Sequence, residues 1–70
     1  SVSVTKANYQ EMQAFATRLE NELDKNKFFY PEGKKKRMKT RLRKLIYGLE
    51  LSKEDVKIFH GVLKSLIKRK

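Results

Sequence analysis

The sequence predicts an all-α fold, a small three-helix bundle. Apolar residues recur at helical spacing in three stretches, at about residues 6–26, 35–48 and 53–68. The connections between these stretches are short, and no alternating pattern is long enough to indicate a β-strand. Amphipathic helices joined in this way form a small bundle. We therefore expect residues 1–4 to be a linker remnant and residues 5–70 to form a single helical domain.

Length and composition limit what this domain can be. A core built from 70 residues rarely supplies more than about 3–5 kcal/mol by itself. There is no cysteine, so disulfides and thiolate zinc sites are excluded. No apolar run approaches the roughly 20 residues that span a bilayer, and we expect a cytoplasmic protein without a membrane partner. The chain begins with Ser1 rather than Met, which favours an excised or processed piece of a longer protein.

The first helix is expected to begin near Thr5 to Asn8. Asn8 with Glu11 three residues later has the spacing of a capping box. The helix should fray by about Asn26. Its predicted apolar face consists of Tyr9, Met12, Phe15, Ala16, Leu19 and Leu23.

Three consecutive aromatic residues follow, in a predicted connection. Pro31 restricts the residue before it to extended geometry and Gly33 permits a turn. Aromatic side chains here either plug the core or offer a stacking platform for bases. We expect Phe28 and Phe29 to plug the core, because few other large side chains are present, and Tyr30 is open to either use.

The second helix carries the densest charge. Eight of the eleven residues from 34 to 44 are basic and none is acidic. Apolar residues at helical spacing, the predicted core face, separate this segment from a disordered tail: Met38, Leu42, Leu45, Ile46 and Leu49. We place Lys34 to Arg37 on the first turn, where cations and free backbone N–H groups together make a phosphate site.

The charge is also unevenly distributed along the chain. Residues 34–70 hold fourteen basic and three acidic side chains, a balance of +11, against four basic and five acidic in residues 1–33, a balance of −1. A rigid cationic surface typically meets a polyanion. Tyr47, opposite the apolar face, is either a tolerated surface residue or a contact to a ribose, base or domain. The candidate nucleic-acid-binding residues are Lys34, Lys35, Lys36, Arg37, Lys39, Arg41, Arg43, Lys44 and Tyr47.

The third helix is expected to begin after a cap at Ser52, with Asp55 as the reciprocal partner. Gly61 lies outside the apolar face, on a strip with Ile58 and Ser65 that is suited to receive a helix from another domain or subunit. The predicted buried face consists of Val56, Phe59, Val62, Leu63, Leu66 and Ile67.

Catalytic and cofactor motifs are absent from the sequence. His60 is the only histidine, and no nucleophile elbow, zinc-protease motif, phosphate loop or dinucleotide fingerprint occurs. We therefore expect no enzyme activity and no cofactor in this chain.

A gapless series over residues 28–61 carries a family resemblance. It contains two phenylalanines, a proline followed by basic residues, a methionine, a leucine-arginine pair and a helix start that leads to a glycine. In this chain these are Phe28-Phe29, Pro31 with Lys34 and Lys35, Met38, Leu42-Arg43, Leu51-Ser52, Val56 and Gly61. The series resembles the C-terminal domain of the bacterial tRNA (cytidine/uridine) 2′-O-methyltransferases of the SPOUT class, a TrmH-like family that modifies an anticodon-loop ribose.

The chain departs from that family's pattern at a few positions. Lys36 and Arg37 stand where the family usually has a proline and a small residue, which adds positive charge. His60 stands where an arginine is common, so no role is carried over to it.

The resemblance implies an accessory domain that docks tRNA and supports packing between domains or in a homodimer. Methyl transfer from S-adenosylmethionine would then be performed by a catalytic domain absent from this chain. Two alternatives remain open from the residues. One is a DNA-binding module of helix-turn-helix type, in which the later helix usually reads the DNA. The other is a purely structural dimerisation domain.

Overall fold

The computed structural model describes residues 5–68, so the expected linker remnant at residues 1–4 lies outside the described part. The element order is α1 (Tyr9–Lys25), α2 (Glu32–Gly48) and α3 (Lys53–Lys68). Within residues 5–68 there is no β-strand, only one isolated antiparallel bridge between Lys6 and Ser52. The fold is therefore the all-α, three-helix bundle that the sequence predicts.

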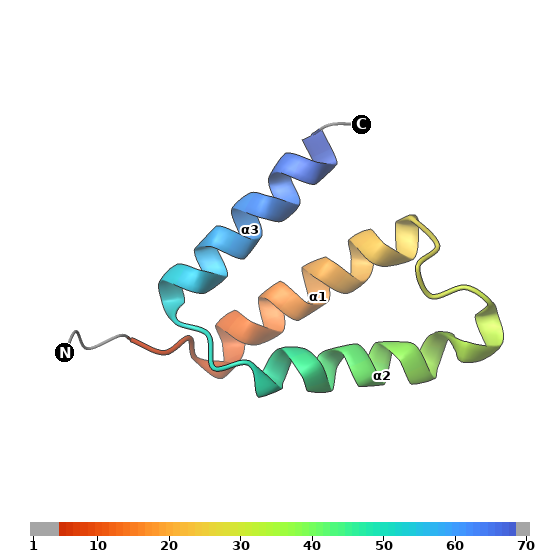
Figure 1. The fold of residues 1–70 in the computed structure, drawn as a ribbon, viewed down its shortest axis with the longest axis horizontal. Helices are drawn as coiled ribbons and strands as arrows, with labels where there is room; N and C mark the ends of the chain where they lie inside the picture. Colours follow the sequence, from red (N-terminus) through yellow and green to blue (C-terminus); the bar gives the residue numbers. More distant parts are fainter. Residues whose placement is uncertain (1–4, 69–70) are drawn as a thin grey trace.

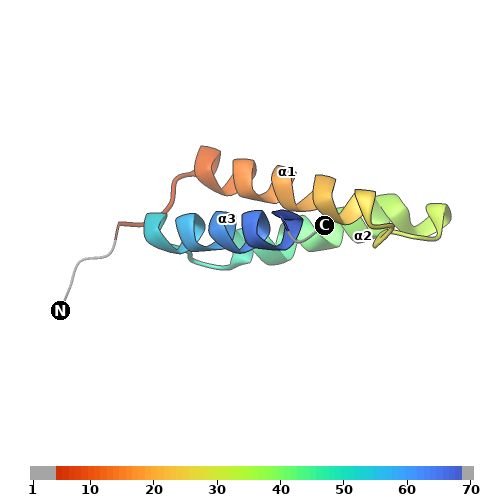
Figure 2. The same ribbon diagram turned by 90° about the horizontal axis from the view of Figure 1, so that it is seen from above.

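The bundle has an open side. α1 forms one layer, and α2 and α3 lie together in a second layer (Figure 2). α2 and α3 diverge from their short connection, as Figure 1 shows. α1 packs against both of the other helices, whereas α2 and α3 make no close backbone approach within the described residues. The side of the second layer that faces away from α1 is therefore left uncovered.

The core lies where α1 meets the other two helices. α1 contributes half of its main cluster, because Met12, Phe15 and Ala16 are all buried. α2 contributes one buried residue, Ile46. The remaining members, Val56 and Leu63, come from α3.

Both predicted helix caps are confirmed. The Asn8 side chain accepts the Glu11 N–H at 2.8 Å, and the Glu11 carboxylate accepts the Asn8 N–H at 2.8 Å. Ser52 and Asp55 exchange the same pair of bonds at 3.0 and 3.1 Å. α1 begins at Tyr9 rather than near residue 6, because residues 5–7 run beside the α2–α3 connection, where the Ala7 N–H donates to the Leu51 carbonyl at 2.9 Å.

The connection after α1 is shorter than expected. Lys27 adopts a left-handed conformation with φ 59°, and the Phe28 N–H donates to the Leu23 carbonyl at 2.9 Å in a Schellman-type ending. α2 then begins at Glu32 instead of near Lys35. Pro31 serves as its extended N-cap, and the acidic side chain of Glu32 suits the positive end of the helix dipole.

This chain reversal separates the two phenylalanines. Phe29 is 2% exposed and is a core plug, as predicted, but Phe28 is 51% exposed. The prediction for Phe28 was wrong because two neighbouring side chains in this tight connection do not both point inward. Tyr30 is exposed as well.

Candidate nucleic-acid interface

The orientation of α2 about its own axis decides which of the predicted binding residues are available. We expected the stripe that includes Leu45 and Leu49 to face the core. Instead Leu45 is 63% exposed and Leu49 49% exposed, and Ile46 is the one buried residue among those described in α2. The face that meets α1 carries Lys35, Arg43, Ile46 and Tyr47.

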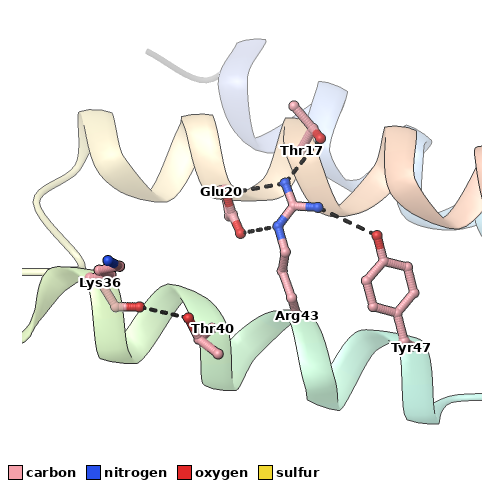
Figure 3. Close-up of polar contacts among 6 residues, drawn as sticks. All are labelled: Thr17, Glu20, Lys36, Thr40, Arg43 and Tyr47. Carbon is pink, nitrogen blue, oxygen red and sulfur yellow. Dashed lines mark hydrogen bonds and ion pairs between the residues drawn. The ribbon is translucent and has the colours of Figure 1, made fainter.

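Arg43 is the centre of the contact between α1 and α2 (Figure 3). Its Nε donates to the Glu20 carboxylate at 2.5 Å, and its Nη2 donates to the same carboxylate at 3.3 Å and to the Thr17 hydroxyl at 3.1 Å. The Glu20 side chain is only 12% exposed. The hydrogen bond from Arg43 to Glu20 is the main cause that raises the pKa of the guanidinium further above its ordinary value. Arg43, one of the candidate nucleic-acid-binding residues, is therefore engaged within the fold.

Tyr47 belongs to the same contact. Its ring stacks on that of Tyr9 with centroids 5.6 Å apart, and its hydroxyl accepts a hydrogen bond from Arg43 at 3.4 Å. Tyr47 is partly buried against the core. Tyr47 therefore makes its contact within the domain, with α1, which neither of the two alternatives from the sequence described.

Two lysines of the basic segment are also engaged within the fold. The Lys35 ammonium lies 3.0 Å from Asp24 of α1 and 3.6 Å from Glu32. The hydrogen bond with Asp24 is the main cause that raises the pKa of Lys35. The Lys39 ammonium lies over the Phe29 ring, 5.5 Å from its centroid.

The other five predicted cations share a different face. All of them are exposed, and none has an ion-pair partner among residues 5–68. We call this set the outer basic face: Lys34, Lys36, Arg37, Arg41 and Lys44. Arg37 and Arg41 are four residues apart on one helix, and such like-charged pairs destabilise it by a few tenths of a kcal/mol each. Within residues 5–68, the outer basic face therefore adds no ion pair that would stabilise the isolated fold.

Two hollows border this face. A shallow one of about 440 Å³ is lined by Lys36, Thr40 and Lys44, together with Arg37 and Arg41. The other is a groove of about 490 Å³ lined by apolar and basic side chains: Phe28, Met38, Leu42 and Leu45, together with Lys34, Arg37 and Arg41. Arg37 and Arg41 line both hollows.

Sequence reasoning missed two contributions to this arrangement. Glu20 of α1 pairs with Arg43, and Asp24 of α1 pairs with Lys35. The spacing of the two acidic residues, four apart on one helix, was the feature of the sequence that could have indicated these pairs. Phe28 lines the groove instead of the core.

His60 lies in α3 and contacts α1. Its Nδ1 accepts a hydrogen bond from Arg18 at 3.0 Å, and its ring lies edge-on to Phe15. Among the described residues no group of three or more His, Asp or Glu side chains is placed to hold a metal ion. The same part of the chain has no helix that is long and apolar enough to cross a bilayer.

The fold and the outer basic face place the chain in the class of small all-α domains with one cationic helix. Residues 10–70 match the family model described as tRNA methyltransferase TrmJ, C-terminal domain. Because the match covers most of the chain, the chain belongs to this family, which confirms the resemblance drawn from residues 28–61. Comparisons with curated proteins and with solved structures gave no match.

Proposed function

We propose that this domain docks tRNA through the outer basic face of α2. In this proposal it is the non-catalytic C-terminal domain of a 2′-O-ribose methyltransferase in the cytoplasm. The catalytic domain of the same protein uses S-adenosylmethionine, and the domain also supports packing against that catalytic domain or in a dimer. The membership in the family of tRNA methyltransferase C-terminal domains supports the placement of this domain beside a methyltransferase domain.

The observation that carries the proposal is the division of cations on α2. Lys35, Lys39 and Arg43 are engaged with groups of the fold, while Lys36, Arg37 and Lys44 are exposed and have no acidic partner among residues 5–68. Uncompensated cations on an ordered helix are costly for folding and useful for a polyanion. Contacts of this kind neutralise phosphates and release counterions.

The two alternatives have less support. A helix-turn-helix module would read DNA with its later helix, yet the uncompensated cations cluster on α2, the earlier helix of the pair. A purely structural dimerisation domain leaves the outer basic face without a role.

The test is the salt dependence of tRNA binding for Arg37→Ala, Lys44→Ala and the double variant. Each lost phosphate contact should reduce the slope of log affinity against log salt by roughly 0.7–0.9. Lys64→Ala, which removes an exposed lysine from α3, is the matched control and should leave the slope unchanged.

Thermal melting monitors the fold of each variant. Well-folded Arg37 and Lys44 variants with the original affinity and slope would refute the proposal. If Lys64→Ala lowered the salt slope and the tRNA affinity equally, the binding would be unspecific attraction by net charge, and the outer basic face would have no special role.

A further inference from the structure

The groove beside the outer basic face is lined by four apolar and three basic side chains. Phe28 is 51% exposed and Leu45 63% exposed, while Met38 and Leu42 are partly buried. Its volume of about 490 Å³ lies within the range of about 300–1,000 Å³ that small-ligand sites occupy. An exposed apolar concavity with a polar rim marks a binding site more often than a packing fault.

The Phe28 ring is held in place from behind. It meets the Phe29 ring edge-on, with centroids 5.3 Å apart and an interplanar angle of 78°. Phe29 is itself buried at 2% exposure, so it gives Phe28 a fixed support. A supported aromatic ring that stays half exposed offers a platform on which a planar group can stack.

The charge around the groove indicates what occupies it. Lys34, Arg37 and Arg41 line it together with the apolar side chains, which favours an anionic partner. A second copy of this chain would bring the same cations and a net charge of +10, so it is disfavoured. Nucleic acid combines flat apolar bases with phosphates, and aromatic stacking beside cations is how proteins hold unpaired nucleotides.

The groove also continues the outer basic face. Arg37 and Arg41 line both the groove and the shallow hollow that Lys36 and Lys44 border. An RNA strand whose phosphates follow the outer basic face therefore has its next nucleotide at the mouth of the groove. Bases inside a duplex are stacked and paired, so only an unpaired base can enter.

We propose that the groove binds an unpaired base of the tRNA, stacked on Phe28, with its flanking phosphates held by Lys34, Arg37 and Arg41. This inference rests on the proposed function and adds to it a preference for a single-stranded part of the tRNA. Met38, Leu42 and Leu45 form the apolar walls around the base.

The first test uses the absence of tryptophan from the chain. Phe28→Trp introduces a single indole into the groove, and tRNA or an unpaired oligoribonucleotide should quench its fluorescence by stacking. Tyr30→Trp is the matched control, since Tyr30 is 71% exposed two residues away and does not line the groove. Stronger quenching for Phe28→Trp than for Tyr30→Trp is expected. Equal quenching, or none, would overturn the inference.

The second test separates stacking from phosphate contacts. Phe28→Leu keeps the groove apolar but removes the ring, and it should weaken binding of unpaired RNA by about tenfold. Binding of duplex RNA and the salt slope should stay unchanged. Full affinity for unpaired RNA in Phe28→Leu would overturn the inference and leave the groove to an apolar protein segment.

The two proposals fail in distinguishable ways. If Lys44→Ala lowers the salt slope while Phe28→Leu has no effect, phosphate docking stands and the base site is refuted. If Phe28→Leu weakens binding while Arg37→Ala and Lys44→Ala leave the slope unchanged, the outer basic face is refuted as the docking surface.

Discussion

α1 contacts its two neighbours through different chemistry. Against α2, ion pairs add to the apolar contacts of Ile46 and Tyr47. Arg43 reaches Glu20, and Lys35 reaches Asp24. Against α3 the contacts are largely apolar, since Phe15 stacks on Phe59 at 5.1 Å and Leu63 is buried. The ion pairs help to fix α2 against α1, while Leu45 stays 63% exposed. The difference teaches that a helix can be anchored partly by charge and leave part of its apolar surface exposed.

The same difference predicts separate responses to salt. Ion pairs near the surface are screened as ionic strength rises, because the Debye length falls to about 3 Å at 1 M. Burial of apolar groups is not weakened in this way. Variants on the two sides of α1 should therefore differ both in size of effect and in salt dependence.

The largest effect is expected on the α3 side, for Leu63→Ala. Leu63 is 7% exposed, and loss of a buried leucine side chain costs about 2–5 kcal/mol. A domain of this size has roughly 3–5 kcal/mol from its core, so the variant should be largely unfolded at 25 °C at either low or high salt. Far-UV circular dichroism with thermal melting measures this.

Leu66→Ala is the matched control on the same helix. The predicted place of Leu66 on the buried face is wrong, because Leu66 is 59% exposed. Its loss should therefore be small. Equal destabilisation by the two changes would contradict the assignment of Leu63 to the core.

The elements and caps were predictable because their signals are local. Asn8 with Glu11 and Ser52 with Asp55 need only residues three apart in sequence, and helical periodicity gave three helices. The orientation of α2 was not predictable from its own apolar stripe. It depends on carboxylates presented by α1, above all Glu20, and a helical wheel of α2 contains no information about them.

The prediction of the candidate site was limited for the same reason, because the sequence does not show which side chains the other helices contact. All eight basic residues of the segment look alike in the sequence, so nothing separates Arg43, which pairs with Glu20, from Lys44 beside it, which is exposed. Whether any of the nine predicted residues contacts RNA stays a prediction.

An intermediate effect is expected on the α2 side, for Arg43→Ala. The Arg43 side chain is 30% exposed and that of Glu20 12% exposed, which lies between exposed pairs worth about 0–1 kcal/mol and buried ones whose disruption costs about 3–5 kcal/mol. We expect a loss of about 1–3 kcal/mol, measured by urea unfolding, that shrinks at 1 M salt. Lys44→Ala, the neighbouring control, should stay within about 0.5 kcal/mol.

If Lys44→Ala lost more unfolding free energy than Arg43→Ala, the distinction between cations that hold the fold and cations available for binding on α2 would be refuted. A loss for Arg43→Ala that does not change with salt would show that packing, and not charge, holds α2 against α1.

The smallest effect concerns Glu11, a charged residue on the α3 side of α1. Its carboxylate lies 2.9 Å from the Lys53 ammonium and accepts the Asn8 N–H at 2.8 Å. The hydrogen bond from Lys53, followed by that from Asn8, lowers the pKa of Glu11 below its ordinary 4.5. Because the folded state has the lower pKa, Glu11 stabilises the fold fully above about pH 4.5, and this contribution is lost as the pH falls through the folded value.

Glu11→Gln keeps a cap of the same shape and should flatten the fall in melting temperature on the acid side. Glu50→Gln is the control, because the Glu50 carboxylate is 77% exposed in a surface pair with Lys6. In this variant the melting temperature should fall with decreasing pH as steeply as in the wild type. Parallel acid limbs for the wild type and Glu11→Gln would show that the contacts of Glu11 with Lys53 and Asn8 do not stabilise the fold.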